Sequence, residues 1–151
     1  RGHPVTLVDR QTEALLDLLP EQRATVIQAD LEDGSPWPLN EKYAGVVVVN
    51  YLHRPLTENL LESLEPGGLL IYETFARGNE NFSRPRNPDH LLKSGELLQV
   101  VLGRLQVIAY EHGIREKSSL PGVIQRICAV NNLDQSVRED REPQVLNLEP
   151  N

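Results

Sequence analysis

The sequence predicts an α/β fold, with helices on the faces of a mostly parallel sheet and a closing antiparallel hairpin near the C-terminus. The first observation is the run Gly45–Val49, which holds four valines without polar alternation, as in strands covered on both faces. The second is the helical spacing of leucines after Pro55, and the third is another apolar run at Leu69–Tyr72. Together they predict a right-handed βαβ crossover.

The N-terminal part repeats this alternation on a smaller scale. Val5–Val8 is a short β-favouring run that ends at Asp9, and Gln11–Leu19 has leucines and an alanine at helical spacing. Thr25–Ala29 predicts a second strand, which ends at Asp30. The stretch from there to the valine run holds one glycine and two prolines, so it predicts a loop.

The part after the crossover predicts a long loop, one helix and two strands. Ala76–Pro88 is polar and irregular, and a loop of that length is usually functional or mobile. Ser94 is the expected N-cap of a helix over Gly95–Leu102. The runs Leu105–Glu111 and Val123–Val130 predict strands joined by a connection too short for a crossover, so they should pair in antiparallel fashion.

Length and composition bound the class of protein. Residues 1–132 are predicted to form one α/β domain, and residues 133–151 a polar, disordered tail. The net charge of −7 without a basic cluster argues against a long nucleic acid as partner. No apolar run approaches the length of about 18 residues that a membrane span needs, so we expect no membrane partner.

Cysteine and histidine usage bears on compartment and metals. The single cysteine, Cys128, rules out an internal disulfide framework and fits a reducing, cytoplasmic setting. It lies within an apolar run, which predicts a buried and inert thiol. His3, His90 and His112 show no ligand spacing, so no metal site is predicted.

Four stretches of the chain resemble class I S-adenosylmethionine-dependent methyltransferases, in the small branch similar to tellurite-resistance protein B. The stretches are VTLVDR, VIQADLED, YAGVVVVNYLHR and LEPGGLLIYETF, and the resemblance covers nearly all of residues 1–132. It implies a Rossmann-like methyltransferase fold in which the last two strands form a reversed hairpin. It also implies S-adenosylmethionine as cofactor and methyl transfer to a small or medium-sized substrate.

The resemblance lacks one part of the family pattern. The family's first strand and its glycine-rich turn have no counterpart from Arg1 onward. For a polypeptide that begins at Arg1, we expect weak cofactor binding and self-association through an exposed sheet edge. With an upstream segment present, the enzyme interpretation applies.

The resemblance assigns cofactor-binding roles to residues that follow the strands. Asp9 would accept hydrogen bonds from the ribose hydroxyls, and Asp30 would face the adenine amino group beside the backbone N–H of Leu31. Arg10 would flank the adenine, and Asn50 would line the methyl-donor pocket. The residues themselves leave simpler roles open, namely a helix cap for Asp9, an Asx turn for Asp30 and plain solvent exposure for Arg10.

Three further residues are candidates for catalysis. Tyr51 would line the methyl-donor pocket, with a place in the core as the alternative. His53 would accept a proton from a substrate nucleophile, because an imidazole can do so near neutral pH, although a histidine before a helix often only satisfies backbone groups. Glu73 could orient a substrate amine or hydroxyl, or it could pair with Arg54.

The long polar loop and two rival functions complete the expectations. Arg84, Arg86 and Asn87 would suit an anionic substrate, with a solvated loop as the alternative. One rival function is a nicotinamide-dependent oxidoreductase, which the closing hairpin and the missing dinucleotide fingerprint disfavour. The other is a non-catalytic interaction domain.

Overall fold

The computed structural model describes residues 2–18, 23–117, 119–135 and 138–147. The chain divides into two compact units, residues 1–40 and 41–151, and each is described by itself. The predicted end of the first helix at Leu19 lies outside the described residues, as does part of the predicted tail. The described residues after 132 include one short 3-10 helix, η5 (Leu133–Gln135). The predicted disorder of the tail stays a prediction.

The first unit is built on two parallel strands. β1 (Val5–Asp9) and β2 (Ala24–Gln28) pair along their whole length, so that Asp9 lies opposite Gln28. The predicted helix between them is a 3-10 helix, η1 (Glu13–Leu18), and an i→i+3 bond from Leu15 N to Thr12 O (2.9 Å) precedes it. β2 ends one residue before the predicted Ala29, and residues 31–42 contain no helix or strand, as predicted.

The second unit contains a four-stranded sheet. Its spatial order is β3 (Tyr43–Val49), β4 (Leu64–Phe75), β6 (Gly122–Val130) and β5 (Gln106–Arg115). The β3–β4 pair is parallel, whereas β4–β6 and β5–β6 are antiparallel. The α/β class and the C-terminal hairpin are therefore confirmed. Among the described strands two pairings are parallel and two antiparallel, so the sheets are only partly parallel.

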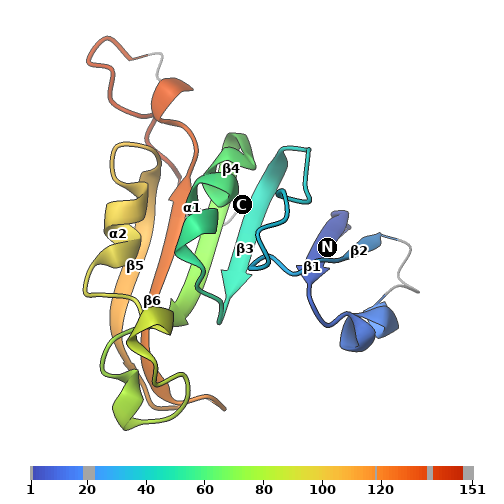
Figure 1. Ribbon diagram of the computed structural model, residues 1–151. Helices are drawn as coiled ribbons and strands as arrows, with labels where there is room; N and C mark the ends of the chain where they lie inside the picture. The colour runs from blue at the N-terminus through green and yellow to red at the C-terminus, as the bar shows by residue number, and fades with distance from the viewer. Residues whose placement is uncertain (1, 19–22, 118, 136–137, 148–151) are drawn as a thin grey trace. The chain divides into compact units, whose positions relative to one another are not determined.

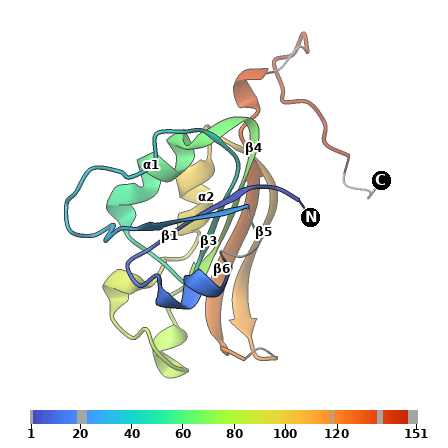
Figure 2. The same ribbon diagram turned by 90° about the vertical axis from the view of Figure 1, so that its right-hand side faces the viewer.

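The helices of this unit cover one face of its sheet. α1 (Thr57–Glu62) follows a 3-10 turn, η2 (Arg54–Leu56), which has Pro55 in its first turn as predicted. α1 and α2 (Glu96–Val101) lie on the same side of the strands (Figure 1; Figure 2). The buried core between them and the sheet contains Val48, Leu61, Leu64, Leu70, Tyr72, Ala76, Leu92, Leu97, Val101, Leu105, Ile127 and Ala129.

The alternate residues of β3 and β4 are exposed, so the prediction from the unbroken apolar run that both faces of the strand are covered is wrong. Val47 and Val49 are 65% and 55% exposed, and Ile71, opposite Val47, is 45% exposed. β3 also lies at the edge of this sheet, with β4 as its one partner among the described strands. An edge strand without charged residues is a template for further pairing. Association of copies along this edge stays a prediction.

β4 begins five residues earlier than the apolar run predicted. The Pro-Gly-Gly turn remains hydrogen-bonded to the sheet, because Gly67 N donates to Asn131 O (2.7 Å) and Asn131 N donates to Gly68 O (2.9 Å). A Cβ at Gly68 would lie 2.9 Å from the carbonyl oxygens of both Glu65 and Tyr43. Glycine is therefore required for this close approach of the two strands.

The start of α2 differs from the prediction. The N-cap is Gly95 with φ of 73°, and Ser94 does not cap the helix. Instead, the amide of buried Gln125 on β6 accepts from Leu97 N (3.3 Å) and donates to Lys93 O (2.6 Å). The cap of α2 therefore comes from β6, and the sequence around α2 does not indicate it.

None of the helices in the described ranges is long and apolar enough to cross a bilayer.

Gly122→Ala is expected to lower the free energy of unfolding by about 1–3 kcal/mol, because overpacking forces neighbours to move. A Cβ there would overlap the Oδ1 atom of buried Asn79 and lie 3.2 Å from Phe75 Cε1. Gly113→Ala on the neighbouring strand is the control, because a Cβ there meets nothing within 4 Å. Chemical denaturation of both variants measures the difference, and equal stabilities would contradict the prediction.

Candidate functional site at the carboxyl ends of the strands

In the first unit the predicted cofactor-binding residues lie together at one end of the strand pair. Asp9 ends β1 and is exposed, and one of its carboxylate oxygens accepts from Gln11 N (2.7 Å). This bond forms an Asx turn, whereas the alternative that the sequence left open for Asp9 was a helix cap, and η1 begins only at Glu13. A carboxylate has further acceptor sites, so this turn does not prevent Asp9 from binding hydroxyl donors.

Asp30 lies two residues after the end of β2. Its Oδ1 accepts from Glu32 N (3.0 Å), which forms the Asx turn considered above, and its Oδ2 lies 3.9 Å from Arg10 Nη1. Gln28 Nε2 donates to Arg10 O (3.2 Å), so the segment after β1 is held beside the end of β2. Leu31 is half-buried next to Asp30. Asp9, Arg10 and Asp30 therefore all lie at the carboxyl end of the β1–β2 pair.

In the second unit Asn50 follows β3 in a left-handed conformation. Its φ is 54°, its side chain is exposed, and its N–H donates to Glu73 O (2.9 Å) at the end of β4. Asparagine tolerates this conformation better than most residues, and left-handed non-glycine residues cluster at functional sites. The bond places Asn50 at the edge of the sheet where β3 and β4 both end.

Tyr51 and His53 lie in the short connection between β3 and η2. Tyr51 packs against the hydrophobic core, in accord with the structural alternative, and its carbonyl accepts from Tyr72 Oη (2.9 Å). Burial raises the pKa of Tyr72 to about 12, so this phenol remains a donor at neutral pH. His53 is the N-cap residue of η2, but its side chain makes no capping hydrogen bond. Its imidazole is half-buried at this edge.

Glu73 is enclosed by arginines. Its carboxylate forms ion pairs with Arg115 Nη1 and with Arg126 Nη1, the second at 3.7 Å, and its side chain is 19% exposed. Arg126 also pairs with Glu111, directly opposite on β5. The suggested pair of Glu73 with Arg54 is therefore wrong. A carboxylate held by two guanidinium groups is not free to orient a substrate amine or hydroxyl, which favours a structural role for Glu73.

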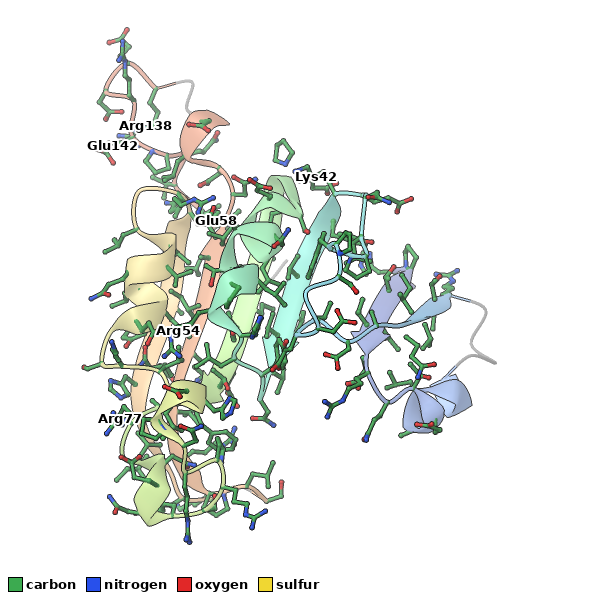
Figure 3. The ribbon with its side chains drawn as sticks, in the orientation of Figure 1. Lys42, Arg54, Glu58, Arg77, Arg138 and Glu142 are labelled. Atoms are coloured by element: carbon green, nitrogen blue, oxygen red, sulfur yellow. The ribbon has the colours of Figure 1, made fainter. Side chains whose placement is uncertain are left out.

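The partner of Arg54, which is labelled in Figure 3, is Glu96 at the first position of α2. The ion pair is bidentate, with Nε to Oε1 at 2.7 Å and Nη2 to Oε2 at 3.0 Å. Arg54 also donates to the carbonyls of Asp89 (2.6 Å) and Leu91 (3.1 Å). One side chain thus joins the segment after β3 to the loop after β4. These residues are 42 positions apart, and no local pattern indicates the pair.

Glu96 gives the stability of the protein a predictable pH dependence. Burial alone would raise the pKa of this carboxyl, but hydrogen bonds from Arg54 and Lys93 N outweigh burial and hold the pKa below 4.5. Glu96 therefore stabilises the fold above that ordinary value, and the contribution is lost as pH falls through the lower folded-state pKa. Glu96→Gln should melt below wild type at pH 7, and the difference should narrow below about pH 4.

Thermal melts between pH 3 and 7 measure this difference. Glu62→Gln, at an exposed position of α1, is the matched control, and its melting temperature should equal that of the wild type at every pH in this range. A melting difference for Glu96→Gln that stays constant down to pH 3 would contradict the assignment.

Cys128 and the metal-ligating residue types of the described chain add neither a reactive thiol nor a metal centre to the candidate site. Cys128 is half-buried rather than fully buried, because it lies opposite Ile71 and Ala109 on the alternate, exposed face. Burial raises the pKa of its thiol, which disfavours the reactive thiolate. Within the described ranges, no three His, Cys, Asp or Glu side chains gather as metal ligands.

Comparison with known proteins defines the fold class. No protein-family model and no curated protein sequence matches the chain. TehB from Haemophilus influenzae has a similar structure, with a TM-score of 0.64 and 16% identity over 86% of this chain. N-methyltransferase NodS from Bradyrhizobium japonicum WM9, in complex with S-adenosyl-L-homocysteine, gives a TM-score of 0.60 and 15% identity. The aligned parts cover 85% of this chain and 66% of NodS.

The chain therefore has the Rossmann-like α/β fold of class I S-adenosylmethionine-dependent methyltransferases. It spans about half the length of the TehB structure that it matches. The [4+2]-cyclase SpnF also has a similar structure, with a TM-score of 0.56 and 12% identity over 85% of this chain and 75% of its own. One fold thus carries different reactions, so the reaction must be argued from the site.

Proposed function

We propose that the protein transfers a methyl group from S-adenosylmethionine to a small or medium-sized acceptor. The observation that carries this proposal is the pair of acids at one end of two adjacent parallel strands: exposed Asp9 ends β1, and half-buried Asp30 follows β2 by two residues. Ligands of open α/β sheets bind beyond the carboxyl ends of the strands. Two acids on neighbouring strand ends suit a nucleoside, which offers vicinal hydroxyls to one and an exocyclic amine to the other.

The roles of the individual residues are those that the resemblance to class I methyltransferases suggests. Asp9 accepts from the two ribose hydroxyls, and Asp30 accepts from the adenine amine, with the Leu31 N–H beside the ring. Arg10 flanks the adenine and is held near Asp30. S-adenosylmethionine supplies an electrophilic methyl group on a sulfonium. Asn50 lines the methyl-donor pocket.

The chain's own contribution to the reaction is mainly alignment. Displacement at a methyl group needs the nucleophile held in line, and positioning of this kind accounts for much of the rate in such reactions. His53 is the candidate proton acceptor, because it is the imidazole at the carboxyl edge of β3. Tyr51 positions this segment through its packing and through the bond from Tyr72 to its carbonyl.

Titration calorimetry of the full-length protein with S-adenosyl-L-homocysteine tests the proposal. We expect binding with a dissociation constant on the order of micromolar, about −8 kcal/mol, and none with NADH. Binding of NADH alone would favour the oxidoreductase instead. Binding of neither ligand would favour the non-catalytic interaction domain, which the exposed edge of β3 also fits.

A further inference from the structure

The two ends of the loop after β4 are hydrogen-bonded to each other next to the sheet. Arg77 N donates to Leu92 O (2.9 Å), and Leu92 N donates to Phe75 O (3.0 Å), so both ends of the loop pair with each other. Leu91 and Leu92 are 0% and 1% exposed. The polar loop predicted from the sequence therefore begins and ends in the core.

The interior of the loop is fixed by side chains. Asn79 is fully buried, and its amide donates to the carbonyls of Ser83 (3.4 Å) and Pro85 (3.1 Å). Asn87 Oδ1 accepts from Asp89 N (3.0 Å), which gives that asparagine a structural role at the start of η4 (Pro88–His90). With the Arg54 bonds described above, these contacts hold the backbone in one conformation.

The tip of the loop presents an aromatic ring and two arginines. Phe82 is 44% exposed, and Arg84 and Arg86 are both exposed. The nearby acid Glu80 is already engaged by Gly78 N (2.7 Å) and by Arg77 (3.4 Å). No carboxylate in the described parts of the chain lies within ion-pairing distance of the two tip arginines. Two cations thus remain available in a chain whose net charge is −7.

We propose that this tip, Phe82 with Arg84 and Arg86, binds a carboxylate group on an apolar organic acceptor. The proposal rests on the proposed function, because it assigns the chemical class of the molecule that receives the methyl group. The loop follows β4 directly, and Asn50 and His53 follow β3, which runs parallel to β4, so the loop begins at the same edge of the sheet as these two residues.

Three physical features make a carboxylate the matching group. A guanidinium offers planar, paired N–H donors that fit the two oxygens of a carboxylate, and such charged bonds are stronger than neutral ones. The exposed ring of Phe82, two residues before Arg84, can contact an apolar body, which an inorganic oxyanion lacks. Because Asn79, Asn87 and Arg54 already hold the loop, binding orders little additional chain.

NMR titration of the full-length protein with benzoate, benzamide and inorganic phosphate tests this assignment. Benzoate should shift the amide signals of Phe82, Ser83, Arg84 and Arg86 and bind at least about ten-fold more tightly than benzamide, which has the same ring without the charge. Benzoate should also bind more tightly than phosphate. The double variant Arg84→Gln, Arg86→Gln should weaken benzoate binding about ten-fold. Arg141→Gln, at an exposed arginine of the C-terminal segment, is the matched control and should leave it unchanged.

Three results would overturn the assignment. They are equal affinity for benzoate and benzamide, phosphate binding as tight as benzoate, and unaltered benzoate binding in the double variant. Binding of S-adenosyl-L-homocysteine is measured on the same samples, which separates the two proposals. If the protein binds S-adenosyl-L-homocysteine but does not bind benzoate selectively, the carboxylate site alone is excluded. If it binds benzoate selectively but does not bind S-adenosyl-L-homocysteine, the methyl-transfer function alone is excluded.

Discussion

Gln125→Leu is expected to lower the free energy of unfolding by about 3 kcal/mol, because each buried polar group left without a partner costs roughly 1–3 kcal/mol. Gln125 is 0% exposed, and its amide oxygen accepts from Leu97 N (3.3 Å) and Tyr110 Oη (3.1 Å). Its amide nitrogen donates to Lys93 O (2.6 Å). Leucine fills the same space but leaves the N–H and the carbonyl at the start of α2 without these bonds.

Equilibrium denaturation in urea measures this loss as a shift of the midpoint at constant slope. Gln99→Leu on the exposed side of α2 is the matched control, and it should stay within about 0.5 kcal/mol of wild type. If Gln125→Leu unfolds at the same urea concentration as that control, the side chain of Gln125 is not the cap of α2.

Asp9→Ala is expected to weaken binding of S-adenosyl-L-homocysteine to the full-length protein by about ten-fold to more than a hundred-fold. The reason is that two ribose hydroxyls lose a charged acceptor, and such a bond contributes roughly 1.5–3 kcal/mol. Titration calorimetry measures the change. Circular dichroism on the same samples confirms that the variant remains folded.

The chain offers a close control for this substitution. Asp33 is an exposed acid of the same unit, and its Oδ1 accepts from Ser35 N (2.8 Å) just as Asp9 accepts from Gln11 N. Asp33→Ala therefore removes the same kind of turn without removing a strand-end acid, and it should leave the affinity unchanged. Equal affinity of Asp9→Ala and wild type would exclude Asp9 from the site, and a loss shared with Asp33→Ala would assign the effect to turn geometry.

The candidate site was predictable where it depends on residues that directly follow a strand. Asp9 comes straight after the apolar run of β1 and Asn50 straight after that of β3, and parallel pairing places each of them at the carboxyl end of its own strand pair. The partners of the charged residues were only partly predictable. Opposite charges at the paired positions of Glu73 and Arg126 suggest a cross-strand pair once the register is known. The pair of Arg54 with Glu96 does not lie at paired strand positions, so the register does not indicate it.

The sequence by itself determined the order and type of most elements of this protein. Burial follows the backbone repeat of a strand or a helix, so the apolar runs at 45–49 and 69–72 and the leucine spacing after Pro55 were sufficient. Only the tertiary structure decided that Gln125 rather than Ser94 caps α2, that Asn131 holds the Pro-Gly-Gly turn in the sheet, and that Arg54 binds Glu96. These contacts join residues far apart in the chain, and they depend on strand register and helix packing, which local periodicity does not specify.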